Sequence, residues 1–198
     1  MLIGIVGAGT MGRSIALRFG FAGEHVILAD RNHLKAAAAV AEMGLAHGLS
    51  AGGMEEALAG DVVVLAIRHP GMTLFASAHA TELLGRIVLD VCDAVDESAR
   101  GPATSAAELL AETLPGSRVV KAFNATIAGI PSPDGAEDAP LDVPIVGDDG
   151  MAKLAMGALL RSAGLRPVDA GRLEGARLLE RRARPAVRSG SPPMPRAA

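Results

Sequence analysis

Aromatic residues are scarce in this chain of 198 residues, which contains four phenylalanines and no tryptophan or tyrosine. Proteins that hold single-stranded nucleic acid stack its bases on aromatic side chains, so this mode of binding is disfavoured. The formal net charge is −3 at pH 7, and residues 181–198 contain five arginines and no acid, which leaves −8 on residues 1–180. An acidic body repels a phosphate backbone. No nucleic-acid partner is therefore expected.

Cysteine occurs once, at Cys92, which excludes an internal disulfide and a zinc site built from several thiolates. This usage points to a reducing compartment, and cytoplasmic is the expected location. No basic segment precedes the first apolar run, and glycine or charged residues interrupt every apolar stretch before it reaches membrane-spanning length. The sequence thus predicts no signal peptide and no membrane association.

What the chain does have is a regular alternation of short apolar runs with segments whose apolar residues recur at helical spacing. Runs rich in β-branched residues, such as residues 2–6, are typical of strands buried on both faces. Strands are predicted at residues 2–6, 25–29, 61–67, 86–91, 118–122, 143–146 and 165–168, and helices at 10–19, 34–43, 72–84, 105–114 and 151–162. This alternation predicts the α/β class, with a doubly wound, mostly parallel sheet of the Rossmann type.

The length fits one domain with little remainder. Residues 1–180 are predicted to form a single dinucleotide-binding domain, with a loop rich in proline, glycine and aspartate at residues 130–140. Residues 181–198 are basic, contain four prolines and lack apolar periodicity, so they are predicted to be a disordered tail.

A glycine-rich turn follows the first predicted strand, with the spacing G-x-G-x-x-G. The first glycine allows a tight turn, the second lets the backbone approach a pyrophosphate, and the third lets the helix pack closely on the sheet. The N–H groups at the start of the helix then hold the phosphate charge. The predicted cofactor-binding residues of this turn are Gly7, Ala8, Gly9, Thr10, Met11 and Gly12.

Asp30 and Arg31 follow the second strand and are the expected contacts of the adenosine half of the cofactor. A carboxylate at this place accepts the ribose hydroxyls and repels a 2′-phosphate, which favours NAD. A guanidinium pairs with a 2′-phosphate or stacks on adenine, which favours NADP. Both cofactors, NAD and NADP, remain open at this point.

Further candidates lie where later strands end, because ligands of doubly wound sheets bind outside the carboxyl ends of the strands. Ile67 ends the third strand in the chain, Arg68 and His69 follow it, and Asn124 lies just past the fifth. Arg68 and His69 have a structural alternative as solvated loop residues, and Asn124 has one as a turn-forming residue. The sequence contains no recognisable set of catalytic side chains and no metal-ligand spacing, so no catalytic residue and no metal are predicted.

The chain also resembles the coenzyme F420-dependent NADP reductases, a family related to the NADPH-binding domain of the Steap metalloreductases. The resemblance extends from residue 1 to about Glu180. Its most specific element is the stretch Val119-Val120-Lys121-Ala122-Phe123-Asn124. The other matching segments are residues 7–12, 61–67, 146–149 and 164–171.

The resemblance implies hydride transfer between nicotinamide and a flat partner such as coenzyme F420, held face to face at the carboxyl ends of the strands. Such chemistry depends on positioning two rings and needs no protein nucleophile. The chain departs from the family at three places: Asp30 replaces Ser or Thr, residues 68–70 read Arg-His-Pro where a single Pro is usual, and Asp93-Ala94 replaces Asn-Pro.

Two other functions remain open from the sequence. One is an NAD(P)-dependent reductase or dehydrogenase of a small hydroxy acid, imine or ketone, although few residues follow Val168 to form a second helical domain. The other is a non-catalytic, dinucleotide-binding redox sensor, which the atypical tail favours. In either case the expected partner is a small molecule, and a homodimer is one way to complete the cleft.

Overall fold

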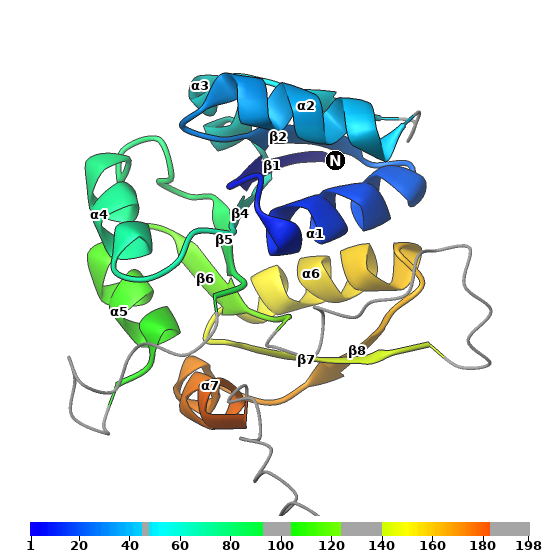
Figure 1. Ribbon diagram of the computed structural model, residues 1–198. Coiled ribbons are helices and arrows are strands. Elements are labelled where there is room, and N and C mark those ends of the chain that lie inside the picture. The colour runs from blue at the N-terminus through cyan, green and yellow to red at the C-terminus, as the bar shows by residue number, and fades with distance from the viewer. Residues whose placement is uncertain (45–47, 93–103, 124–139, 183–198) are drawn as a thin grey trace, which may run out of the picture.

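The computed structural model describes residues 1–44, 48–92, 104–123 and 140–182 (Figure 1). In this part of the chain, eight strands form one sheet with the order β3-β2-β1-β4-β5-β6-β7-β8. The strands are β1 (Leu2–Val6), β2 (His25–Ala29), β3 (Leu49–Ala51), β4 (Val62–Leu65), β5 (Ile87–Asp90), β6 (Arg118–Lys121), β7 (Asp142–Gly147) and β8 (Arg166–Asp169). The α-helices are α1 (Thr10–Phe21), α2 (His33–Met43), α3 (Met54–Leu58), α4 (Gly71–Ala78), α5 (Ala106–Thr113), α6 (Gly150–Ser162) and α7 (Ala176–Arg182).

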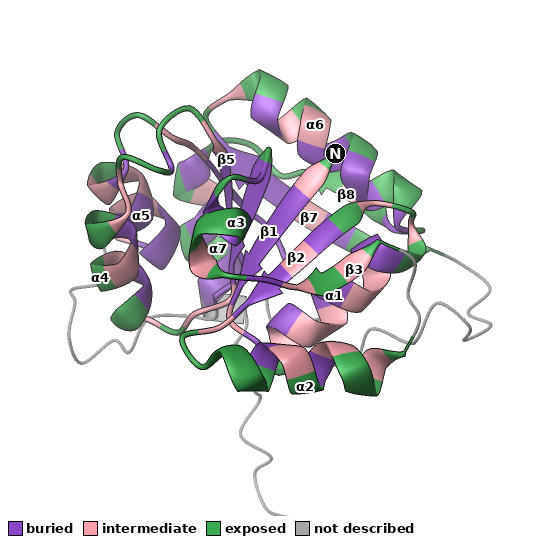
Figure 2. Ribbon diagram, turned by 90° about the horizontal axis from the view of Figure 1, so that it is seen from above, coloured by how far each residue is buried: buried purple, intermediate pink, exposed green. Residues whose placement is uncertain are grey.

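Helices cover both faces of the sheet, which explains why the central strands are apolar on both sides (Figures 1 and 2). Helices α1, α2 and α6 pack on one face, where Phe19, Ala36 and Met156 join one hydrophobic core. Helices α3, α4, α5 and α7, with the 3-10 turn η2 (Leu173–Gly175), supply the second core on the other face. The observed three-layer architecture confirms the predicted fold class.

The carboxyl ends of five parallel strands meet at one edge of the sheet. In register, Ala29 of β2 pairs with Val6 of β1, Val6 with Leu65 of β4, Leu65 with Asp90 of β5, and Asp90 with Lys121 of β6. The residues that follow these five positions therefore lie at the same end of the sheet, which is where doubly wound sheets bind their ligands.

Strand β7 is the exception in an otherwise parallel sheet, because it pairs antiparallel with β6 while β8 pairs parallel with β7. An antiparallel neighbour needs no crossover helix. The mostly parallel sheet predicted from the sequence is thus confirmed, with one antiparallel pair.

Two short elements, β3 and α3, lie in a segment for which the sequence predicts no structure. They have three and five residues, too few for a period to be visible. The presence of α3 explains a glycine inside β1, because a Cβ at Gly4 would lie 1.7 Å from the carbonyl oxygen of Ala57 in α3.

Helix α4 ends earlier than predicted, at Ala78 rather than residue 84.

Helix α7 ends at Arg182 and so crosses the domain boundary predicted at residue 180. The predicted loop at residues 130–140 and the predicted tail lie almost entirely outside the described residues. None of the helices in the described part of the chain is both long and apolar enough to cross a membrane.

Candidate functional site

The glycine turn between β1 and α1 has the geometry that its three glycines require. Gly7 has φ +113°, and its N–H donates to the Ala29 carbonyl oxygen at 2.8 Å, which ties the turn to β2. A Cβ at Gly12 would lie 1.8 Å from the Gly7 carbonyl oxygen, so only glycine lets α1 pack this closely on the turn. The backbone of the turn is therefore held in one conformation.

Gly9 leaves the beginning of α1 open to a ligand. It is the N-cap of α1, no side chain accepts a hydrogen bond there, and the first turn carries no acidic residue. By contrast, the side chains of Asn32, Ser105 and Asp149 cap α2, α5 and α6. A Cβ built on Gly9 meets no atom within 4 Å. The N-terminus of α1 thus offers unsatisfied N–H donors and free space, which suit a pyrophosphate.

The other three residues of the turn differ in how far they are buried. Ala8 is buried, Met11 is half-buried, and Thr10 is exposed at the start of the helix. Arg13, one helical turn further and not predicted from the sequence, donates from Nε to the Ala8 carbonyl oxygen at 3.2 Å and pairs with Glu42. Arg13 therefore supports the turn and already has a carboxylate partner.

Asp30, at the end of β2, is bound within the protein. One carboxylate oxygen, Oδ2, accepts the Ala8 N–H at 2.9 Å and the Lys35 ammonium at 3.0 Å, while Oδ1 accepts the Asn32 N–H at 3.1 Å. Burial raises the pKa of Asp30, but the hydrogen bonds from Ala8, Asn32 and Lys35 outweigh it and hold the pKa below the ordinary 3.8. Asp30 thus fastens the glycine turn to β2.

Lys35 is a cation that sequence reasoning missed at this position. The Lys35 side chain is 46% exposed and its ammonium lies beside the Asp30 carboxylate. The Asp30 side chain is only 10% exposed. Arg31, which was predicted, is exposed at the same strand end. The available signal was the spacing, because a lysine in the first turn of α2 lies over the residues that precede that helix. The end of β2 therefore carries one internally paired carboxylate with Lys35 beside it, and the exposed Arg31 comes next in the chain.

The predicted residues after β4 lie between that strand and α4. Ile67 and His69 are half-buried, and Arg68 is exposed. The Ile67 carbonyl oxygen accepts a hydrogen bond from the Cys92 thiol, which links the loops that follow β4 and β5. Asn124 lies outside the described residues, so its predicted role is a hypothesis only. Phe123, just before it, is buried and packs edge-on against Phe19.

Sequence reasoning also missed three charged side chains that are buried near the ends of β5 and β6: Asp90, Lys121 and Glu180. A charge closing an otherwise apolar strand was the signal for Asp90, because a buried charge requires a partner. Their partners are described below. The described residues contain no group of three side chains that could hold a metal ion.

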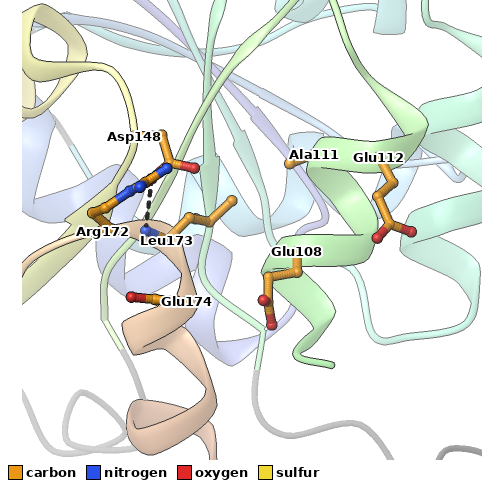
Figure 3. A pocket seen from close by; sticks show the side chains of 7 residues that line it. All are labelled: Glu108, Ala111, Glu112, Asp148, Arg172, Leu173 and Glu174. Atoms are coloured by element: carbon orange, nitrogen blue, oxygen red, sulfur yellow. Dashed lines mark hydrogen bonds and ion pairs between the residues drawn. The ribbon is translucent and has the colours of Figure 1, made fainter. Parts of the chain in front are cut away.

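A cavity of about 320 Å³ lies between α5 and η2 and includes none of the predicted cofactor residues (Figure 3). It is lined by Glu108, Ala111, Glu112, Asp148, Arg172, Leu173 and Glu174. Asp148 accepts hydrogen bonds from the Arg172 side chain and the Leu173 backbone. Four carboxylates and one guanidinium line the cavity, which makes it unfavourable for an anionic dinucleotide. The glycine turn remains the better site.

Comparison with known proteins agrees with the resemblance noted in the sequence. Residues 2–93 match the family model of coenzyme F420-dependent NADP oxidoreductases. The chain is 30% identical over 195 residues to the F420-dependent NADP reductase of Methanothermobacter thermautotrophicus, and the match covers 89% of this chain and 83% of that protein. It is 32% identical over 180 residues to the metalloreductase STEAP3 of Rattus norvegicus, covering 90% of this chain but only 35% of STEAP3.

Solved structures give the same result. A candidate F420-dependent NADP reductase from Arthrobacter sp. FB24 superposes with a TM-score of 0.74 at 25% identity, covering 89% of both chains. The hypothetical protein SMa0349 from Sinorhizobium meliloti superposes with a TM-score of 0.72 at 28% identity, covering 89% of this chain and 88% of that one. By sequence and by fold, the chain belongs to the family of coenzyme F420-dependent NADP oxidoreductases.

Proposed function

We propose that this chain binds NADP(H) along the carboxyl ends of the parallel strands and transfers a hydride between the nicotinamide and coenzyme F420. The observation that carries the proposal is the open N-terminus of α1 at Gly9, in a turn whose geometry is fixed by Gly7 and Gly12. Exposed N–H donors and the positive end of the helix dipole stabilise a pyrophosphate there. The membership in the family supports the choice of F420 as the second substrate.

The residues after β2 favour NADP over NAD. The Asp30 carboxylate is paired with Lys35 and accepts two backbone N–H groups, so its charge is compensated inside the protein. Arg31 is exposed beside it and adds a further positive charge. A 2′-phosphate at this place meets two cations and one compensated anion, and charge-assisted hydrogen bonds to phosphate are among the stronger polar contacts.

The variant Lys35→Met tests this preference. We expect it to weaken NADPH binding about tenfold, or ~1.4 kcal/mol, because it removes a cation and leaves the Asp30 charge uncompensated next to the 2′-phosphate. NADH binding should change much less. Fluorescence titration of both reduced cofactors measures the two dissociation constants.

Lys153→Met is the matched control, because Lys153 pairs at 2.9 Å with Asp169 of β8, the outermost strand on the side of the sheet away from β2. Both dissociation constants should then equal those of the wild type. An equal loss of NADPH and NADH affinity in Lys35→Met would contradict the role of Lys35 in selecting NADP.

The proposed chemistry makes few demands on protein side chains. When bound, the nicotinamide supplies or accepts a hydride at its C4 atom, and the protein orients the two rings and excludes water. The glycine turn fixes the pyrophosphate, and the residues after β4, β5 and β6 border the space for the rings. This chemistry requires no catalytic side chain, and the sequence predicts none.

The test is a turnover assay with reduced F420 and either NADP⁺ or NAD⁺. The reaction is monitored by the increase in the absorbance of oxidised F420. We expect turnover with NADP⁺ and a much smaller kcat/KM with NAD⁺. Tight NADPH binding without turnover would contradict the proposed reaction and favour the redox-sensor alternative. A failure to bind either dinucleotide would overturn the whole assignment.

A further inference from the structure

Three charged side chains are buried together where β5 and β6 end. The Lys121 ammonium lies 2.9 Å from Asp90 Oδ2 and 3.3 Å from Glu180 Oε1. The side chains of Lys121 and Asp90 are fully buried, and that of Glu180 is 6% exposed. We call these three residues the buried charge cluster. It joins neighbouring strands to α7, a helix near the end of the described chain.

The cluster holds the backbone of the residue that leads out of β5. Lys121 Nζ donates to the Cys92 carbonyl oxygen at 2.8 Å, and the Cys92 N–H donates to Asp90 Oδ1 at 2.8 Å. Both backbone polar groups of Cys92 are therefore bound by charged side chains of the cluster. Charge-assisted hydrogen bonds of this kind restrict the backbone more strongly than neutral ones.

Glu180 connects this arrangement to the beginning of α5. Its two carboxylate oxygens accept the N–H groups of Ala106 at 3.0 Å and Ala107 at 3.3 Å. These are the first two residues of α5, where backbone donors have no partner within the helix. The Ser105 side chain accepts the third N–H, from Glu108. Glu180 thus fixes the start of α5 and the Lys121 ammonium at the same time.

Stability alone does not account for a cluster of this composition. Apolar side chains of similar volume often replace a buried ion pair with no loss of stability, because removing charges from water is costly. Burial lowers the pKa of Lys121, but the charges of Asp90 and Glu180 outweigh it and raise the pKa above the ordinary 10.5. Lys121 is therefore cationic near neutral pH, and the cluster defines a geometry that an apolar core would not.

The position of the cluster indicates which part of the site it serves. The strands run in the order β2-β1-β4-β5-β6, and the glycine turn follows β1. The adenosine half of a dinucleotide lies toward β2 in such a sheet, so the nicotinamide half extends over β4, β5 and β6. Cys92 is then part of the border of the nicotinamide half.

We propose that Lys121, Asp90 and Glu180 are positioning residues that fix the Cys92 backbone and the start of α5 beside the nicotinamide ring. The proposal rests on the proposed function, since it assumes a bound dinucleotide, and it adds that α7 contributes to ring placement through Glu180. The cluster is expected to affect the nicotinamide half of the site and not the adenosine half.

The test compares two ligands in wild type and Glu180→Gln, which removes one charge and keeps the shape. The ligands are NADPH and 2′-phospho-ADP-ribose, which has the same adenosine and pyrophosphate groups but no nicotinamide. We expect Glu180→Gln to lower kcat for hydride transfer to F420 about tenfold, equivalent to ~1.4 kcal/mol in the barrier. Its affinity for 2′-phospho-ADP-ribose should equal that of the wild type.

Arg177→Gln is the matched control, because Arg177 also ties α7 to α5, through an exposed pair with Glu108, but does not contact the cluster. It should leave kcat unchanged. Equal losses in the two variants, an unchanged kcat in Glu180→Gln, or a loss of affinity for both ligands would overturn the positioning role. If the wild type itself fails to bind NADPH or to transfer hydride, the proposed function fails with it, and the wild-type measurements alone reveal this.

Discussion

Replacing Gly9 with valine is expected to lower the affinity for NADPH by about 100-fold or more, or ~2.7 kcal/mol, in a protein that still folds. Gly9 has φ −83° and ψ −175°, which any residue adopts, and its Cβ would meet no protein atom within 4 Å. The valine side chain therefore occupies the space in which the pyrophosphate approaches the backbone. Isothermal titration calorimetry with NADPH measures the loss, and circular dichroism checks the fold.

The chain offers a closely matched control for this experiment. Gly53 is the N-cap of α3, with nearly the same backbone conformation, φ −73° and ψ 165°, and it is also exposed. Gly53→Val should leave NADPH affinity unchanged and cost about as much stability as Gly9→Val, on the order of 1 kcal/mol for a poor N-cap residue. Wild-type affinity in Gly9→Val would contradict the dinucleotide assignment.

The variant Lys121→Met is expected to lower the free energy of unfolding by about 3–5 kcal/mol, since it leaves the carboxylates of Asp90 and Glu180 buried without their cation. The raised pKa of Lys121 means that its stabilising effect is fully present below pH 10.5 and is lost only as the pH rises through the higher folded-state value. Urea unfolding at pH 7 and pH 9 should therefore give the same large difference from the wild type.

The control for Lys121→Met is Lys153→Met, which removes a lysine whose carboxylate partner stays in contact with water. The Lys153 side chain is 16% exposed, but its partner Asp169 is 62% exposed, so no buried charge is left behind and this change should cost no more than about 1 kcal/mol. Equal and small losses in the two variants would mean that water reaches the buried charge cluster and that the cluster does not fix the strand ends.

The sequence predicts the beginning of the fold well because local and tertiary signals agree there. Strands β1 and β2 begin and end where expected, and α1 extends two residues beyond its predicted end. Their apolar runs are buried on both faces, and glycines mark the turns. In contrast, β3 and α3 are too short to show a period in the sequence. Their contacts with β2 and β1 stabilise them, and such contacts cannot be read from a local pattern.

The site illustrates the same limit. The glycine turn could be predicted because its chemistry is contained in six successive residues. The pairing of Asp30 with Ala8 and Lys35 could not, because it depends on how β2 and α2 lie against the turn. Glu180 and Lys121 are 59 residues apart in the chain, and only the packing of α7 on the second face of the sheet brings them together.

The most direct test of the proposed function follows the transferred hydrogen itself. NADPH carrying deuterium at the transferable C4 position is incubated with the protein and oxidised F420, and the reduced F420 is analysed by mass spectrometry. The proposal predicts one deuterium on the ring carbon of reduced F420, since a carbon-bound hydrogen does not exchange with water on this timescale. Reduced F420 without deuterium, or no reduction of F420 at all, would contradict direct hydride transfer by this protein.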